Sequence, residues 1–134
     1  MPTQEQIQAA QQASESALPF AELLATRLTD IADGLRRGDD APALSSLSES
    51  TSDIESFLTY LTLVSEIVDA EGPVSTRVVE YVGSIAKQVE SLEEPLTNLD
   101  LVEVADTIEL DLVRNLEGYP DIHKILCTHL DCAN

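Results

Sequence analysis

The stretch FAELLATRLTDIADGLRRGDDAP, residues 20–42, combines a helical apolar pattern with the signals that end one helix and begin another. Its large apolar residues recur every three or four positions, which stacks them on one helix face: Phe20, Leu24, Leu28, Ile31 and Leu35. Arg36 and Arg37 suit the negative end of the helix dipole, and Gly38 can adopt the left-handed cap conformation. Pro42 is well placed as an early residue of the following helix. The stretch therefore predicts two antiparallel helices joined by a tight turn.

Helical spacing continues through two further segments. In the second helix the apolar stripe is Leu44, Leu47, Ile54, Leu58, Leu61 and Val68. Thr51 and Ser65 stand there at positions where a larger apolar residue is expected. Gly72 ends this helix and Pro73 can begin the third one. The stripe of the third helix is Val74, Val78, Val82, Ile85, Val89 and Leu92, and its spacing favours a helix over a strand although many members are β-branched.

The remaining segments complete a bundle. The stretch EEPLTNLD interrupts the pattern, and Asp100 can cap a fourth helix that runs to about Leu116, with Glu103 as its capping-box partner. Residues 121–134 form a tail that adds one or two helical turns, and residues 1–17 can form an exposed helical arm because they contain few large apolar side chains. We expect the first helix to extend upstream through a bend at Pro19. The sequence predicts one domain, residues 1–134, an all-α, up-and-down four-helix bundle with an N-terminal helical extension and a short C-terminal helical tail.

The composition limits the classes of partner. The 134 residues include 25 Asp plus Glu and only seven Lys plus Arg, for a formal net charge of -18. Such a surface repels phosphate backbones and anionic lipids, so neither nucleic acid nor a membrane is expected as a partner. Proteins from salty environments and small acidic export chaperones both have this balance of charge. Because the N-terminal stretch lacks the pattern of a signal peptide and no apolar run is long enough to span a membrane, we expect a cytoplasmic protein.

The stretch DLVEVADTIELDL, residues 100–112, contains five carboxylates. On a helical wheel its apolar residues gather on one side: Leu101, Val104, Ala105, Ile108 and Leu112, with Leu116 beyond them. The carboxylates of Asp100, Asp106, Glu109 and Asp111 are spread around the helix instead of converging, so neither paired-carboxylate catalysis nor a di-iron centre is expected. We expect Asp106 and Glu109 to act as capping or tertiary hydrogen-bond residues.

The fourth helix also resembles that of an uncharacterised bacterial family of small acidic helical-bundle proteins, a domain of unknown function. The shared pattern is roughly D-x-V-x-x-A-D-x-x-x-x-(D/E)-L followed by a distal leucine, here Asp100, Val102, Ala105, Asp106, Asp111, Leu112 and Leu116. Leu110 and the segment LTYL depart from the aromatic residues that this family carries. The resemblance implies a helical bundle and no particular activity.

The C-terminal tail holds the cluster of soft and imidazole donors: His123, Cys127, His129 and Cys132. Zn²⁺ accepts four such ligands. The order H-x3-C-x-H-x2-C is not a standard zinc spacing, however, and one helix cannot surround an ion without unwinding. We therefore expect no metal site in the tail. The alternative is that the chain is a small metal-binding or metal-responsive protein that uses this cluster. A histidine phosphotransfer domain has this size, but its histidine lies in the middle of an exposed helix face.

Motifs for covalent catalysis and for phosphate-binding loops are missing from the sequence, so we expect neither an enzyme nor a cofactor. The Ser- and Thr-rich second helix and the Ala- and Gln-rich start offer surfaces on which another helix can lie. Phe57, Tyr60 and Tyr81 are the predicted anchors, because aromatic residues dominate interface energies. The sequence thus favours a non-enzymatic, chaperone-like or adaptor bundle that binds a basic or amphipathic helix of a partner protein, or a second copy of itself.

Overall fold

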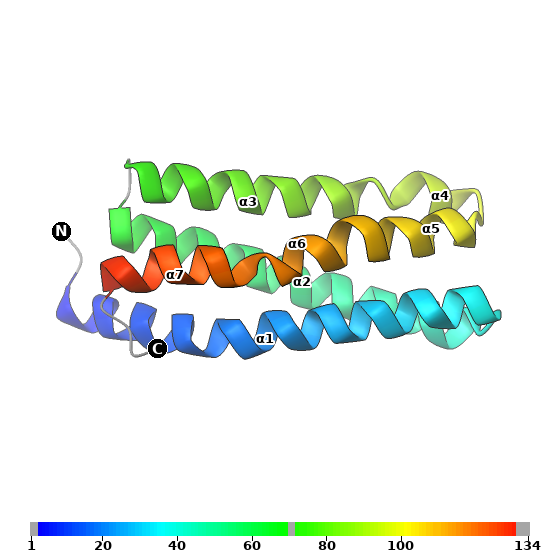
Figure 1. Ribbon diagram of the computed structural model, residues 1–134, viewed down its shortest axis with the longest axis horizontal. Helices are drawn as coiled ribbons and strands as arrows, with labels where there is room; N and C mark the ends of the chain where they lie inside the picture. The colour runs from blue at the N-terminus through cyan, green and yellow to red at the C-terminus, as the bar shows by residue number, and fades with distance from the viewer. Residues whose placement is uncertain (1–2, 70–71, 131–134) are drawn as a thin grey trace.

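The computed structural model describes residues 3–69 and 72–130, which form four helical arms lying side by side (Figure 1). The first two arms are the long helices α1 (Gln4–Arg37) and α2 (Asp40–Asp69). The third arm is α3 (Pro73–Glu90) followed by the single turn α4 (Glu93–Thr97). The fourth arm runs through α5 (Leu101–Thr107), the π-helical segment η1 (Ile108–Val113), α6 (Arg114–Glu117) and α7 (Tyr119–Leu130). Successive arms run in opposite directions, so the predicted all-α bundle is confirmed.

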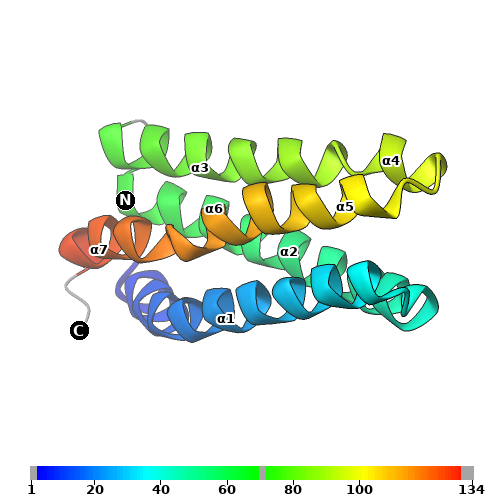
Figure 2. The ribbon, with the colours of Figure 1, turned by 45° about the vertical axis from the view of Figure 1, so that its right-hand side comes forward.

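The helix boundaries follow the predicted signals. Gly38 has a φ of 87°, the left-handed conformation that glycine adopts without a steric penalty, and it caps α1. Pro73 is the first residue of α3. Pro19 lies inside α1, which stays helical on both sides of it, and the N-terminal turns of α1 diverge from the axis of the rest (Figure 2).

The N-terminal residues pack more tightly than the sequence suggested. Ala10, Ser14 and Ala17 are buried, so residues 3–17 are not an exposed arm. The Tyr60 hydroxyl of α2 donates a hydrogen bond to the Ser14 hydroxyl at 3.2 Å. Small side chains let the neighbouring helices approach closely at this end of the bundle, and a search for large apolar residues overlooks that kind of core.

The core is aliphatic along most of its length. Leu24, Leu28, Leu61 and Ile85 are fully buried, as their spacing predicted. The two small residues of the second stripe hydrogen-bond to their own helix: the Thr51 hydroxyl donates to the Leu47 carbonyl, and that of Ser65 donates to the Thr62 carbonyl. Their polar groups are therefore satisfied next to the core without a partner from another helix.

The fourth arm differs from the single α-helix that we predicted. Ile108, Leu112 and Val113 are all buried in η1, although Ile108 and Val113 are five residues apart. The i→i+5 hydrogen bonds of a π-helix accommodate one extra residue in the turn, which lets both side chains face the core. A hydrophobic pattern drawn for α-helical spacing cannot show this.

The C-terminal segment is also more than a short tail. The twelve-residue helix α7 buries Tyr119, Ile122 and Leu126 completely. It lies against the N-terminal half of α1, where the Gln11 side chain donates to the Leu130 carbonyl. Within the described residues, no helix is long and apolar enough to cross a membrane.

Candidate functional site

The acidic stretch of the fourth arm makes structural contacts. Arg36, in the last turn of α1, donates to Asp106 at 2.9 Å and to Glu109 at 2.7 Å. These two hydrogen bonds to carboxylates stabilise the charged guanidinium and raise the pKa of Arg36 above its ordinary value, Glu109 having the larger effect. They are tertiary hydrogen bonds of the kind expected for Asp106 and Glu109.

Asp100 caps α5, but the capping box is incomplete. Its carboxylate accepts a hydrogen bond from the Glu103 backbone N–H at 3.2 Å. The backbone N–H of Asp100 donates to the Pro95 carbonyl at 2.8 Å, so the Glu103 side chain has no part in the cap, contrary to our prediction. Asp111 is exposed on η1. In this stretch, therefore, Asp100 caps a helix, Asp106 and Glu109 form ion pairs, and Asp111 is exposed to solvent.

Two of the three predicted aromatic anchors lie in the core. Phe57 is 2% exposed and Tyr81 is 6% exposed, so neither can anchor a partner at the surface. The ring of Phe57 packs edge-on against Phe20 and Tyr119, with centroids 6.0 and 5.1 Å apart. These contacts build an aromatic cluster where α1, α2 and α7 meet. The apolar face of α2 is wider than the stripe read from its sequence, because it includes Phe57 beside Leu58.

Tyr60 is half-buried and lies at the rim of a small apolar groove between α1 and α2, which we call the Phe20 groove. The groove has a volume of about 270 Å³. Its lining is Ala13, Ser16, Ala17, Phe20, Ser56, Phe57 and Tyr60. Of the three predicted anchors, Tyr60 is therefore the one that the structure leaves partly accessible.

Of the predicted His/Cys cluster, the structure brings His123 and Cys127 into contact. His123 and Cys127 are both buried on α7, with Cys127 Sγ 3.5 Å from His123 Nε2. His129 is exposed and its Nδ1 lies 3.1 Å from the Ile125 carbonyl oxygen, while Cys132 lies outside the described residues. Among residues 3–69 and 72–130, no group of three or more His, Cys, Asp or Glu side chains is placed to hold a metal ion. His123 is also buried, whereas the histidine of a phosphotransfer domain must be exposed.

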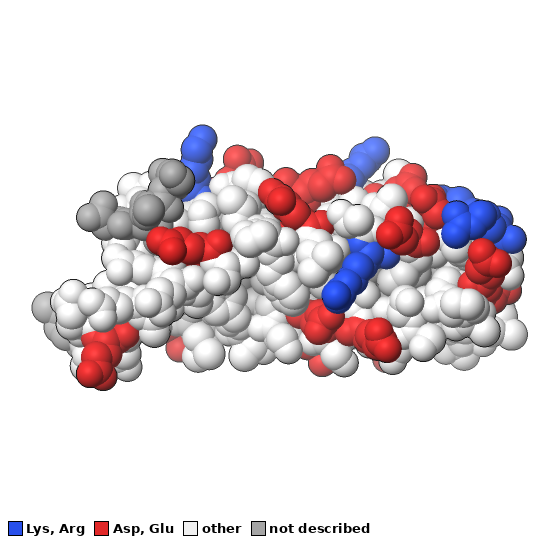
Figure 3. Space-filling model, turned by 90° about the horizontal axis from the view of Figure 1, so that it is seen from below, with Lys and Arg blue, Asp and Glu red and all other residues white. Residues whose placement is uncertain are grey.

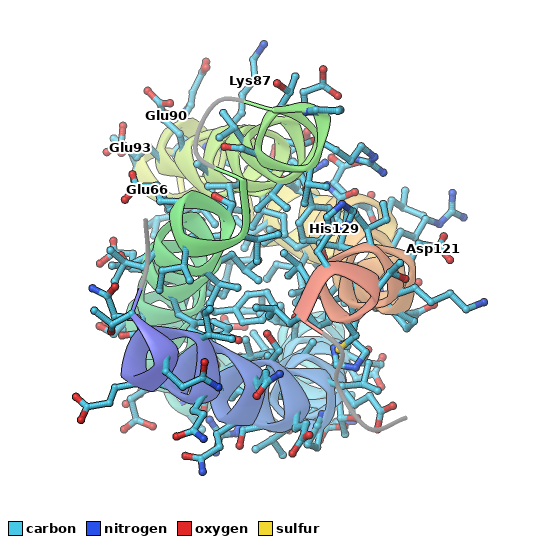
Figure 4. All side chains as sticks on the ribbon, turned by 90° about the vertical axis from the view of Figure 1, so that its left-hand side faces the viewer. Glu66, Lys87, Glu90, Glu93, Asp121 and His129 are labelled. Carbon is cyan, nitrogen blue, oxygen red and sulfur yellow. The ribbon has the colours of Figure 1, made fainter. Side chains whose placement is uncertain are left out.

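A larger apolar groove lies where α2 passes α3 and α4, and we call it the α2–α4 groove. It has a volume of about 400 Å³. Ala86, Val89, Leu92 and Leu96 provide its apolar lining, and Thr51 also lines it. Its charged lining is three carboxylates: Glu55, Glu90 and Glu93. Figure 4 shows Glu90 and Glu93 projecting on the same side of the bundle as Glu66 of α2, whereas Lys87 projects in another direction.

Sequence reasoning missed this groove. Its residues come from three helices, and the pairing of α2 with the α3–α4 break is a property of the fold. One signal was available: Val89 and Leu92 continue the apolar stripe of α3 directly into the break, where Glu90 and Glu93 alternate with them.

A third groove, of about 460 Å³, lies between the C-terminal half of α1 and the start of α2. Its lining mixes both signs of charge, and its two arginines are paired: Arg27 with Asp53 at 2.9 Å and Arg37 with Asp39 at 3.4 Å. This groove is therefore less selective for a charged partner than the α2–α4 groove.

No protein-family model matches the chain, and neither a curated protein nor a solved structure is detectably similar to it. The resemblance of the fourth helix to a bacterial family stays a prediction.

Proposed function

We propose that this protein is a non-enzymatic interaction module that binds a basic amphipathic helix of a partner protein in the α2–α4 groove. The observation that carries the proposal is the groove itself, which joins an apolar floor to a rim of three carboxylates. A module of this kind acts as an adaptor or as a chaperone-like holder of one partner segment.

The apolar floor suits the apolar face of a helix. Leu92 is 3% exposed and forms the base, while Val89 and Leu96 are half-buried and still have surface to cover. An amphipathic helix in a groove presents side chains at i, i+3, i+4 and i+7 to such a floor. Each large aliphatic side chain that moves from water into an apolar site gains roughly 1.5–3 kcal/mol. Two or three such side chains supply the main favourable term for binding.

The rim selects the charge of the partner. Glu55 lies on α2, and Glu90 and Glu93 lie across the groove on α3 and α4. Lysines or arginines on the flanks of a bound helix therefore meet carboxylates on both sides. Each exposed ion pair is worth only about 0.2–1 kcal/mol, so this charge contributes more to the association rate and to selectivity than to affinity. The net charge of -18 adds long-range attraction for a basic partner.

The apolar groove between α1 and α2 lacks this selectivity. The Phe20 groove has no Asp, Glu, Lys or Arg among its lining residues. A basic helix gains no local ion pair there, so the α2–α4 groove suits a basic partner better than the Phe20 groove does.

The test is the binding of a synthetic, fluorescently labelled peptide that is helical, amphipathic and Lys/Arg-rich on its polar face. Fluorescence anisotropy would measure its Kd for the full-length protein at low and at high salt. We expect saturable binding that weakens as salt is added, because screening acts on the exposed rim pairs. A peptide with the same apolar residues and Glu in place of Lys and Arg should bind at least about tenfold more weakly, a difference of about 1.4 kcal/mol.

Matched variants locate the site. Ala86 is exposed and lines the groove, so Ala86→Trp should fill the groove and abolish most of the binding. Ala41→Trp makes the same change at an exposed position on α2 that does not line it and should bind as the parent protein does. Similarly, Glu90→Gln with Glu93→Gln should weaken binding more than Glu80→Gln with Asp121→Asn, which removes the same charge elsewhere. Equal affinities for Ala86→Trp and Ala41→Trp would contradict the proposal.

A further inference from the structure

A second apolar stripe runs along the outside of α1, next to the stripe that packs in the core. Its members are spaced alternately by four and three residues, the spacing of a coiled-coil seam: Ala9, Ala13, Ser16, Phe20 and Leu23. Ala9, Ser16 and Leu23 are exposed, and Ala13 and Phe20 are half-buried where they line the Phe20 groove. Leu23 is 47% exposed. We call this set the outer stripe.

The outer stripe is nearly free of charge on a strongly acidic protein. Residues 6–21 contain a single charged residue, Glu15, and residues 56–65 of the neighbouring α2 contain none. In Figure 3, where α1 faces the viewer, the uncharged surface is widest over the half of the molecule that holds the N-terminal half of α1. A second copy with a charge of -18 meets the least like-charge repulsion at such a face.

When the outer stripes of two copies run in opposite directions, the large side chains of one lie near the small side chains of the other. Two α1 helices that cross in antiparallel fashion at Ser16 place Ala9 of one copy opposite Leu23 of the other. Ala13 comes opposite residue 19, so Phe20 lies only one residue, about 1.5 Å, further along the helix axis. Each large side chain then meets a small one, which allows close packing of two helices.

The charges at the two ends of the outer stripe are complementary in the same arrangement. Glu5 precedes Ala9 by four residues and Arg27 follows Leu23 by four, so both continue the stripe. The antiparallel crossing that pairs Ala9 with Leu23 also brings Glu5 of each copy next to Arg27 of the other. Arg27 is half-exposed and is held by Asp53 at 2.9 Å, and its guanidinium has further donors for a second carboxylate.

From this double complementarity we infer that the protein forms a two-fold symmetric dimer in which the α1 helices pair in antiparallel fashion along the outer stripe, with Ser16 at the axis. A two-fold interface must be self-complementary, and the outer stripe meets that condition in size and in charge. In this arrangement Phe20 of each copy lies close to Ala13 of the other, at the lining of its Phe20 groove, and Leu23 lies against Ala9 outside that groove.

The dimer leaves the α2–α4 groove accessible. Figure 4 shows α1 on the opposite side of the bundle from Glu90 and Glu93. The assembled module therefore presents two helix-binding grooves, and a partner with two basic segments can bind more tightly through both. The dimer does not depend on the function proposed above, because the two use separate surfaces.

Sedimentation equilibrium of the full chain over a wide concentration range tests the dimer. We expect the parent protein to be dimeric. Ser16→Glu places two carboxylates face to face at the axis and should raise the dimer dissociation constant by about tenfold or more. Ser48→Glu makes the same change at an exposed position of α2 outside the grooves and should leave the dissociation constant unchanged. A parent protein that stays monomeric, or a dimer indifferent to Ser16→Glu, would overturn the inference.

A charge exchange tests the antiparallel register. Glu5→Arg and Arg27→Glu should each weaken the dimer, and the double variant should restore it, because every exchanged pair again has opposite charges. If the double variant is as weak as the single variants, the register is wrong. Circular dichroism checks that each variant keeps its helix content. Binding of the basic peptide to Ser16→Glu should be unchanged, so failure of the dimer and failure of the proposed groove are distinguishable.

Discussion

Tyr81 and Asn115 connect the third and fourth arms, since the Tyr81 hydroxyl donates a 2.6 Å hydrogen bond to the Asn115 backbone carbonyl. The Asn115 side chain donates in turn to Gln88 Oε1 at 2.7 Å. Both contacts lie just before the break at Gly118, where α6 ends and α7 begins. The hydroxyl of a core tyrosine therefore fixes the position of the fourth arm where its helix is interrupted.

Removing that hydroxyl should destabilise the protein. Tyr81→Phe keeps the ring beside that of Tyr119, with centroids 6.2 Å apart, and deletes one buried donor. We expect the free energy of unfolding to fall by about 1 kcal/mol, because the Asn115 carbonyl also accepts from the Gly118 N–H. Urea denaturation measures the loss. Tyr60→Phe is the comparison, since its bond to Ser14 is longer at 3.2 Å, and it should cost less. An equal or larger loss for Tyr60→Phe would contradict this ranking.

The same tyrosine should make stability depend on alkaline pH. Burial raises the pKa of Tyr81 above the ordinary value of 10.0, and the nearby Arg77 opposes this only in part. A group whose folded-state pKa is raised stabilises the fold fully below its unfolded pKa and loses that contribution as pH rises toward the folded pKa. The free energy of unfolding should fall above about pH 10, by up to about 1.4 kcal/mol per pH unit.

The Tyr81→Phe variant isolates this effect from the other tyrosines. Urea denaturation at about pH 9 and about pH 11 should show a smaller decline for the variant than for the parent protein. Parallel declines in the two proteins would mean that Tyr81 ionises as easily in the folded state as in the unfolded one.

The ion pairs of Arg36 should contribute little stability and be sensitive to salt. Arg36→Met removes both bonds while keeping much of the side chain's apolar stem. Because all three side chains are partly exposed to solvent, we expect a smaller loss than for Tyr81→Phe, and the loss should shrink as salt is added. Urea denaturation at low and high ionic strength provides the comparison. A large loss that high salt leaves intact would show that Arg36 does more than form exposed ion pairs.

The extra residue in η1 should be removable. Leu110 is 50% exposed, and its deletion can convert the π turn into an α turn while the flanking helices keep their register. We expect the deletion variant to stay folded, with a loss of about 1 kcal/mol. Deletion of Lys124, which is exposed in regular α7, should instead rotate Leu126 and Leu130 out of the core and cost about 2–5 kcal/mol or more. Similar losses for both deletions would contradict this account of η1.

Much of the fold could be predicted from local signals. Gly38, Gly72 and Pro73 mark helix ends because their backbones favour those positions, and the spacing of large aliphatic residues identified the core faces. The N-terminal core at Ala10, Ser14 and Ala17 was missed because small side chains give little hydrophobic signal. The π turn was missed because an apolar pattern in sequence carries no information about which hydrogen bonds the backbone makes.

The surface was harder to predict than the core. Phe57 and Tyr81 looked like anchors because a helical pattern alone does not show how wide the buried face of a helix is. The α2–α4 groove depends on which arms become neighbours and on the break between α3 and α4. Neither is determined by the local sequence around Ala86 or Leu96, so the candidate site came from the three-dimensional arrangement.

The most direct test of the proposed function is an NMR titration of the isotope-labelled full-length protein with the basic amphipathic peptide. The α2–α4 groove predicts that the backbone amide shifts concentrate at residues 51–55 and 86–96, saturate together, and disappear in Ala86→Trp. Shifts centred on the Phe20 groove instead, or shifts in the α2–α4 groove that persist unchanged in Ala86→Trp, would contradict the proposed site.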